Sequence, residues 1–211
     1  MTVRDYLNAI CADKRANVPA EWTSGSMMTR SEHGLLGAVL LDDAGVYRDD
    51  LLQGTTILLH PDQDVCDCVH EAVACILGDD VRLLMHGTWF DAYDDAVNDG
   101  TPVVIVSFDK TVVFPQDAVL LADRVVDVGD VGRPEVVAAL IETITGAIVR
   151  LSPDEAASFE AASLMRCVHF AASADDVTCR LAAWLKEHRT KNPTAYASAA
   201  PRAPRRTNLR G

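Results

Sequence analysis

The chain has 211 residues, of which 49% are hydrophobic and 24% are charged, and this composition indicates a folded globular protein rather than a disordered one. Its formal net charge of −12 argues against a body that attracts nucleic-acid phosphates. No apolar run approaches the roughly 20 residues of a membrane-spanning helix, and the start lacks the pattern of a secretory signal, so we expect a cytoplasmic protein without membrane association.

The first quarter of the chain predicts helices. Residues 2–15 carry apolar side chains at three- and four-residue steps, and residues 31–41 repeat this pattern. The intervening residues 16–30 are rich in Pro, Ser and Gly and predict a loop. One more helical turn fits residues 46–53. We therefore expect residues 1–54 to form an N-terminal helical segment.

The middle of the chain predicts an α/β domain. Short apolar runs bounded by Gly, Pro or Asp predict strands, and the segments between them carry apolar stripes at helical spacing. This alternation is typical of a mainly parallel sheet covered by helices. The expected fold class is α/β, a three-layer sandwich with a mainly parallel sheet over residues 55–150. The expected strands are 55–60, 81–85, 102–107 and 124–128, and the expected helices are 64–77, 88–98, 116–123 and 134–145.

Single residues predict several helix ends. Asp64 is expected to cap the helix after the first strand, because its carboxylate can accept a hydrogen bond from a free backbone N–H group. Gly146 is a natural residue to follow the helix 134–145. Ser152, followed by a proline and two acids, predicts another helix start.

The last part of the chain predicts a small helical subdomain and a tail. Residues 153–165 and 174–188 predict helices, and we expect residues 151–189 to form a lid-like unit beside the sheet. Residues 190–211 are rich in Pro, Ala and Arg and predict a flexible basic tail.

Charge is unevenly distributed along the chain. Six bases and no acid follow His188, so residues 1–187 hold 13 bases and 31 acids, a formal net charge of −18. The basic end could bind an anionic partner, fold back on the acidic body, or be a solvated linker.

The order of elements resembles the AAA+ ATPase module, in which an α/β domain precedes a small helical subdomain. The likeness is carried by an apolar strand that ends at Ser107 and Asp109, as in the family's sensor-one strand. Pro115, a helix, and Arg124 before the final strand follow in the family's order. The resemblance implies that Ser107, Asp109 and Arg124 contact a nucleotide or a partner, with Arg124 as an arginine finger; it could instead be a surface arginine paired with a neighbouring Asp.

The departures from this family concern phosphate binding. No Gly-x-x-x-x-Gly-Lys-Ser/Thr sequence occurs in the chain, and the residues after the first strand, 60–64, contribute carboxylates. The strand 81–85 is not followed by adjacent acids for magnesium. The chain therefore resembles the degenerate, non-hydrolysing N-terminal module of bacterial AAA+ ATPases of the cell-division-cycle type, either as a fragment or as a standalone relative. That resemblance implies assembly, regulation or recruitment through a protein partner or a homo-oligomer, possibly with an AAA+ ATPase, and no cofactor.

Two other functions fit the residues. A small α/β enzyme, a hydrolase or transferase, could use His60, His86 and Asp109 at one edge of the sheet, since histidines and carboxylates there can exchange protons. Alternatively, Asp109 is an ordinary loop carboxylate and the protein is a standalone acidic adaptor. The Cys66-x-Cys68-x-His70 sequence lacks a second pair of zinc ligands, so we expect no metal.

Overall fold

The computed structural model describes a large part of the chain. The predicted helix 2–15, most of the predicted helix 116–123 and the predicted tail beyond residue 191 lie outside the described residues. The described residues are 25–85, 90–108, 122–146, 148–167 and 174–191.

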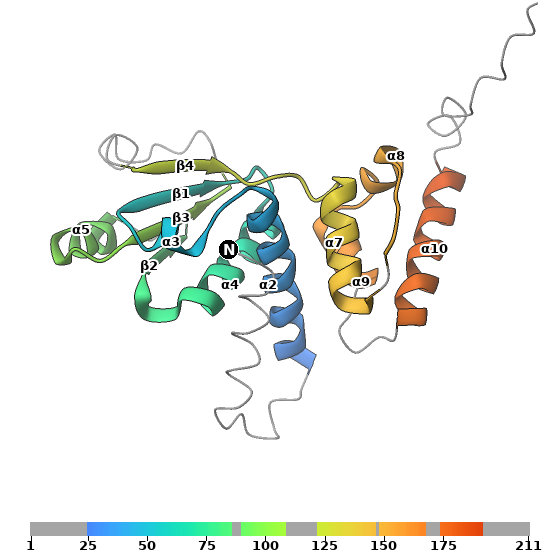
Figure 1. Ribbon diagram of the computed structural model, residues 1–211, viewed down its shortest axis with the longest axis horizontal. Helices are drawn as coiled ribbons and strands as arrows, with labels where there is room; N and C mark the ends of the chain where they lie inside the picture. Colours follow the sequence, from blue (N-terminus) through green and yellow to red (C-terminus); the bar gives the residue numbers. More distant parts are fainter. Residues whose placement is uncertain (1–24, 86–89, 109–121, 147, 168–173, 192–211) are drawn as a thin grey trace, which may run out of the picture.

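Four parallel strands form one sheet in the order β2-β3-β1-β4 (Figure 1). The central strand β1 (Thr55–Leu59) pairs with β3 (Val103–Ser107) on one side and with β4 (Arg124–Asp127) on the other. Beyond β3 lies β2 (Arg82–Met85). The α/β class and the mainly parallel sheet are confirmed, and each strand matches its predicted range to within one residue.

Side chains of β1 and β3 are buried on both faces of the sheet. Ile57 and Ile105 belong to a small cluster on one face, whereas Leu58 and Val104 belong to the main core on the other. Because neither face meets water, these strands appear in the sequence as continuous apolar runs without alternation.

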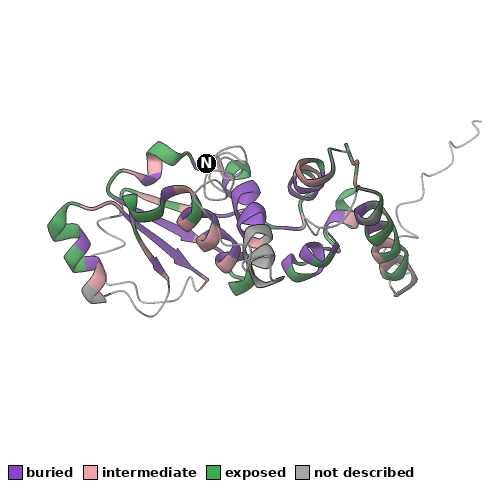
Figure 2. Ribbon diagram, turned by 90° about the horizontal axis from the view of Figure 1, so that it is seen from below, coloured by how far each residue is buried: buried purple, intermediate pink, exposed green. Residues whose placement is uncertain are grey.

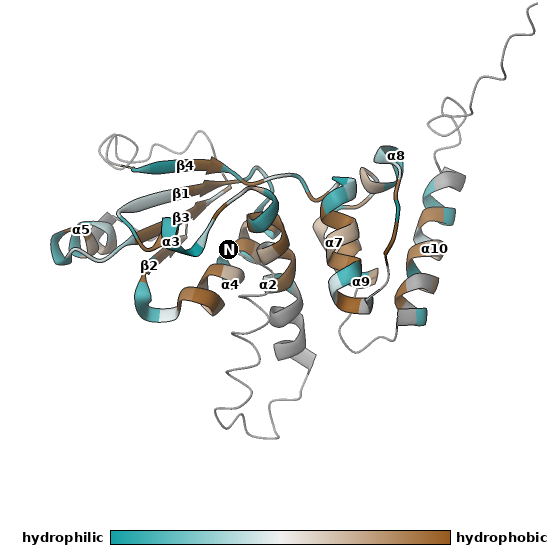
Figure 3. Ribbon diagram, in the orientation of Figure 1, coloured by the Kyte–Doolittle hydropathy of each residue, from teal (hydrophilic) through white to brown (hydrophobic). Residues whose placement is uncertain are grey.

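Helices cover the two faces unequally. The helix α4 (Gln63–Leu77) packs on the face of the main core and continues through a 3-10 turn (Gly78–Asp80) into β2. On the other face α5 (Phe90–Asp99) packs against β2 and β3. The predicted three-layer sandwich stays a prediction, since the chain that links β3 to β4 lies outside the described residues. Figure 3 shows hydrophobic residues on the strands and α4, and hydrophilic ones at the start of β4 and on α5.

The helix α2 (Gly25–Asp43) lies at the centre of the molecule, between α4 and α7 (Pro134–Thr145). Its segment 35–41 is almost completely inaccessible to solvent, and Figure 2 shows this burial beside the exposed surfaces of α5 and α10. The prediction of a loop over 16–30 was wrong for its last six residues. Met and Arg at 27, 28 and 30 are good helix formers, and the Gly there stands at the helix start, where it does not interrupt the helix.

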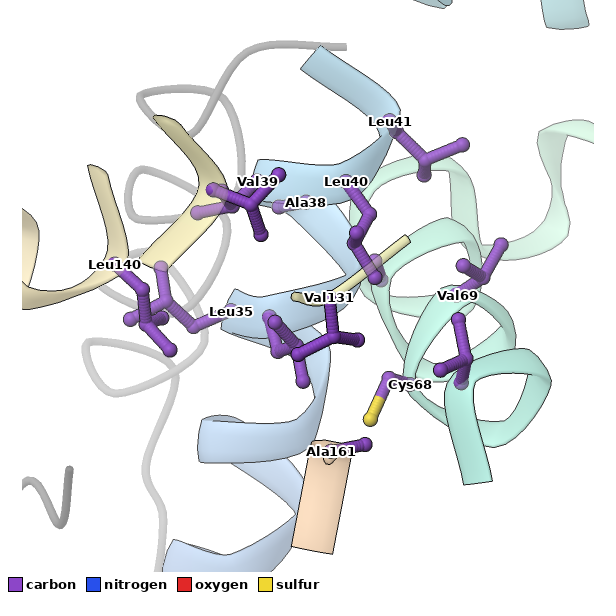
Figure 4. Close-up of a cluster of buried hydrophobic side chains, with 14 of the residues drawn as sticks. Leu35, Ala38, Val39, Leu40, Leu41, Cys68, Val69, Val131, Leu140 and Ala161 are labelled. Carbon is purple, nitrogen blue, oxygen red and sulfur yellow. The ribbon is translucent and has the colours of Figure 1, made fainter. Parts of the chain in front are cut away.

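Gly37 is the point of closest approach between α2 and α4. A Cβ atom at this position would overlap the carbonyl group of Cys68 and lie 2.8 Å from the nitrogen of Val69. A glycine without a side chain lets the two backbones touch. Figure 4 shows the main core beside α2 and α4, with labelled side chains from α2, α4, α7, α9 and the turn at Val131.

Several predicted helix ends are confirmed. The short helix α3 (Arg48–Leu51) lies within the predicted turn 46–53. Gly146 has a left-handed conformation with φ of 70° and donates its N–H to the carbonyl of Glu142 at 2.7 Å, which ends α7. Ser152 and Glu155 form a reciprocal capping box at the start of α8 (Pro153–Ala156).

The predicted single helix 153–165 is wrong, because the structure has two helices there. After α8 the chain turns before α9 (Ala161–Cys167), and the Ser158 hydroxyl donates to the carbonyl of Glu155 at 2.6 Å. The Glu160 N–H donates to the Ser163 hydroxyl at 2.9 Å, and such bonds from serine compete with helix continuation. The last helix, α10 (Ala174–Lys191), ends three residues later than predicted.

One hydrophobic cluster joins most of these elements. It contains side chains of α2, α4, one face of the sheet and the helices α7 to α10. Phe159 and Trp184 stack at its border with ring centroids 6.0 Å apart. The predicted boundaries of the sheet domain at residues 55 and 150 therefore fall within a continuous core, and the division into four segments stays a prediction.

Candidate functional site

The carboxyl ends of β1 and β3 form the topological switch point of the sheet. From β1 the chain passes over β3 to reach β2, whereas from β3 it passes to the opposite side of β1 to reach β4. Ligands of open α/β proteins bind in the crevice outside such a point. The residues that follow these two strands are therefore the first candidates for a functional site.

His60 follows β1 at this switch point and is almost completely buried. Its backbone N–H donates to the carbonyl of Ser107 at 3.1 Å, which extends the pairing of β1 and β3 by one step. Its ring Nδ1 accepts a hydrogen bond from the backbone N–H of Asp62 at 3.0 Å. The same nitrogen lies 3.4 Å from the carbonyl oxygen of Asp62, so these two contacts hold the ring against the start of α4.

Asp62 occupies the N-terminal end of α4, where the first N–H groups of a helix attract anions. Its carboxylate accepts a hydrogen bond from the N–H of Asp64 at 2.9 Å. The predicted cap, Asp64, was thus two residues too late, because Asp62 has the extended backbone that a capping residue requires and Asp64 is already inside the helix. The two exposed carboxylates place negative charge where a phosphate loop would lie.

Ser107 ends β3 beside His60 and is also buried. The other two residues of the predicted acid/base group, His86 and Asp109, lie outside the described residues. The structure therefore brings Ser107 to His60 and leaves the complete group a prediction.

Arg124 lies away from this site. It starts β4 in register with Thr56, four residues before His60, which is about 13 Å along the strand direction. Its guanidinium forms an ion pair with Asp50 and donates to the carbonyl of Gly45 at 3.2 Å. The ion-pair partner of Arg124 is thus Asp50 and not an aspartate beside it in the sequence. The two contacts of Arg124 connect β4 to the segment before β1.

Cys66 and Cys68 are buried on opposite sides of α4. Burial, together with nearby aspartates, raises the pKa of Cys66 to about 11 and that of Cys68 to about 12. The Cys66 thiol donates to the carbonyl of His60 at 3.5 Å. Metals bind the thiolate form, which this environment disfavours. Among the described residues no group of three His, Cys, Asp or Glu side chains is placed to hold a metal ion.

Sequence reasoning missed the contact between Gly54 and Asp123. Gly54 has φ of 57°, and the Asp123 carboxylate fills the space where its side chain would be. Asp123 accepts from the N–H of Thr55 at 2.8 Å and donates its own N–H to the Thr55 carbonyl at 2.9 Å. The Gly before β1 was a detectable signal for a left-handed turn. No local pattern indicates the contact with Asp123, because Asp123 is 69 residues away from this glycine in the sequence.

No protein-family model, curated protein or solved structure matches the chain. Within its described part, no helix has the length and apolar character needed to cross a membrane. The function of the chain therefore has to be inferred from its own residues and geometry.

Proposed function

We propose that this chain is a non-catalytic AAA+-like module that serves assembly, regulation or partner recruitment for an ATPase. The observation that carries the proposal is the acid-capped start of α4 directly after β1. In phosphate-binding α/β proteins this helix end offers free N–H groups and the positive end of the helix dipole to an anion. Here the Asp62 carboxylate accepts one of those N–H groups, and Asp64 adds a second negative charge.

Electrostatics supports a module that does not hold a triphosphate. Two like charges 4 Å apart repel each other by roughly 4 kcal/mol at the effective dielectric constant of a protein surface. Two carboxylates in the first turn of α4 therefore oppose a phosphate that the helix end alone would attract. The residues between β1 and α4 contain no lysine or arginine that could offset this charge.

The relationship to the AAA+ module is supported by the arrangement of elements. A parallel sheet with a central first strand is followed in the chain by a group of helices that packs on α7 and α4. A protein that keeps this arrangement without a phosphate-binding loop is suited to contacts with other proteins. The negative charge of residues 1–187 favours a partner with a basic contact surface.

The test is calorimetric titration of the purified chain with ATP and ADP, with and without magnesium. We expect no saturable binding up to about 1 mM nucleotide. The double variant Asp62→Asn and Asp64→Asn keeps a capping residue and removes both charges. Any nucleotide binding that this variant gains measures how strongly the two carboxylates repel the phosphates. Magnesium-dependent binding to the unaltered chain, or release of phosphate from ATP by it, would refute the proposal.

Assembly is tested separately by light scattering at several protein concentrations. We expect a concentration-dependent mass, or a complex with an added AAA+ ATPase. A mass that stays monomeric, with no such complex, would remove the assembly and recruitment roles.

A small α/β enzyme that uses His60 together with His86 and Asp109 is the second candidate. The observation that favours it is the buried ring of His60, which the backbone of Asp62 contacts at Nδ1 beside the switch point. The test is a panel of ester and phosphoester substrates with the His60→Gln variant as the control. Turnover that this variant abolishes would favour the enzyme over the non-catalytic module.

A further inference from the structure

A hollow of about 270 Å³ lies at the amino end of the sheet, opposite the switch point. It opens between the C-terminal end of α5 and the starts of β1 and β3. This volume is below the about 300–1,000 Å³ of pockets for drug-sized ligands, so the hollow suits a small group and not a nucleotide. The residues that line it are Gly54, Thr55, Tyr93, Val97, Gly100, Thr101, Pro102 and Asp123.

Three hydroxyl groups in the lining have no partner in the described part of the chain. The Thr55 and Tyr93 residues are each only 5% exposed, and Thr101 is half-buried. Their hydroxyls make no hydrogen bond with any described residue. The fully buried side-chain atoms without a partner among the described residues are Thr56 Oγ1 and Trp184 Nε1, so the hydroxyls of the lining are open to solvent in the hollow. The three hydroxyls are therefore positioned to bind a polar group that enters the hollow.

The electrostatic character of the hollow is negative. One oxygen of the Asp123 carboxylate accepts the N–H of Thr55 at 2.8 Å, and the other accepts no hydrogen bond from the described residues. The C-terminal end of α5, which carries the negative end of a helix dipole, borders the same space. No basic side chain lines the hollow among the described residues.

We propose that this hollow binds a small organic cation, an alkylammonium or guanidinium group. The cationic head donates hydrogen bonds to the free oxygen of Asp123 and to the hydroxyls of Thr55 and Thr101. Its methylene stem lies against the ring of Tyr93 and the apolar walls, which are formed by Val97 and Pro102. The site is independent of the proposed function, because it uses none of the residues at the switch point.

The cation has two possible sources, a free amine or the side chain of a lysine or arginine on another protein. Both present the same head and stem, so the hollow alone does not separate them. A side chain arrives with a peptide backbone on its stem, whereas a free amine does not.

The experiment is an NMR titration of the full chain with n-butylammonium, with the neutral n-butanol as the matched probe. We expect saturable shifts of amides near Thr55 and Thr101 with the ammonium and at least tenfold weaker binding of the alcohol, about the effect of one charge-assisted hydrogen bond. Equal binding of the two probes, or no saturable shift with the ammonium, would overturn the proposal.

Variants locate the site. Asp123→Asn keeps an acceptor for the Thr55 N–H and removes the charge, and we expect it to weaken ammonium binding about tenfold. Tyr93→Phe removes one hydroxyl from the lining without changing its shape. The control is Asp95→Asn, an equal charge change at an exposed position of α5 outside the hollow, which should leave binding unchanged. An effect of Asp95→Asn equal to that of Asp123→Asn would show attraction by overall charge and would contradict a site.

A second arm compares n-butylammonium with lysine blocked at both its amino and carboxyl groups. Tighter binding of the blocked lysine supports a protein side chain as the natural occupant. Tighter binding of n-butylammonium supports a free amine. Failure of both to bind would contradict the proposal whatever the outcome of the nucleotide titrations.

Discussion

The two faces of the sheet differ in what covers them. On one face, which we call the thickly covered face, α4, α2 and the helices α7 to α10 form a single large core with closely packed backbones and side chains. On the other face α5 covers a small cluster, and Thr55 and Tyr93 line a hollow beside it. The large core and the proposed ligand site thus lie on opposite faces of the sheet. Substitutions in the large core should lower the free energy of unfolding. Substitutions around the hollow should change ligand binding more than stability.

The largest effect is expected for Gly37→Ala on the thickly covered face. The new methyl group would overlap the backbone of Cys68, so α2 and α4 would have to separate within the main core. We expect a loss of about 3 kcal/mol or more in the free energy of unfolding, at the upper end of overpacking costs. Helix propensity alone predicts the opposite sign, a gain of about 1 kcal/mol. Urea unfolding followed by circular dichroism measures the difference.

The control for Gly37→Ala is Gly146→Ala. Gly146 has the left-handed conformation with φ of 70°, but a methyl group added there would have no atom within 4 Å, so the change costs only the backbone strain of about 1–2 kcal/mol. If Gly37→Ala were as stable as the unaltered protein, the close approach of α2 and α4 would be wrong.

The second effect concerns Gly54→Ala at the rim of the hollow. Gly54 has φ of 57°, and its new methyl group would displace the Asp123 carboxylate from the N–H of Thr55. We expect a loss of about 2–3 kcal/mol, from left-handed strain together with the lost hydrogen bond. Gly146→Ala is the matched control, since it has a similar φ of 70° and open space around it. Equal losses in the two variants would show that the Asp123 contact contributes nothing.

The third effect is a pH dependence that belongs to the thickly covered face. Burial raises the pKa of Cys66 to about 11 and of Cys68 to about 12, from an ordinary value of 9.0. Above that ordinary value the unfolded thiols lose protons that the folded thiols keep, so the stability falls as pH rises from 9.0 toward these values. We expect about 1–2 kcal/mol less stability at about pH 9.5 than at about pH 8 from these two groups.

Variants separate the thiols from other groups that titrate in this range. Cys68→Ala should reduce the dependence of urea stability on alkaline pH, whereas Cys75→Ala at an exposed position should not. A pH slope that is the same in both variants would contradict the role of the buried thiol. The exposed Cys75 should also react faster than Cys68 with a thiol reagent, which tests burial without changing the sequence.

Local patterns predicted the sheet but not where two helices begin and end, because backbone geometry and side-chain bonds decide these points. Each strand is a short apolar run between turn residues, and burial on both faces follows directly from that composition. The cap of α4 was misplaced by two residues, because Asp62 and Asp64 are equally good acids and only backbone geometry separates them. The break after α8 depends on side-chain bonds of Ser158 and Ser163 that helical periodicity does not register.

The candidate site was predictable only in part, for a different reason, which is the distance along the sequence between residues that meet in space. His60 could be placed at the end of a strand, since the strand itself was evident. The hollow could not be predicted, because it requires the pairing of β1 with β3 and the contact of Asp123 with Thr55, which join residues far apart in the sequence.

The smallest effect is expected for the ion pair of Arg124 and Asp50, at the edge of the thickly covered face. Both side chains are about one-third exposed, and pairs of this kind contribute little because water screens them. The N–H of Tyr47 and then the Arg124 guanidinium lower the pKa of Asp50 below its ordinary value of 3.8. The contribution of Asp50 is therefore present above that value and lost as pH falls below it.

A double-mutant cycle of Arg124→Gln and Asp50→Asn measures this pair through urea unfolding at neutral and at acidic pH. We expect a small favourable coupling at neutral pH that disappears as Asp50 becomes protonated. The outcome also bears on the implied arginine finger. An arginine that serves a partner's nucleotide should be replaceable without loss of stability, and its loss should lower the activity of the partner. A coupling to Asp50 without any effect on a partner would instead assign Arg124 to holding β4 against the segment before β1.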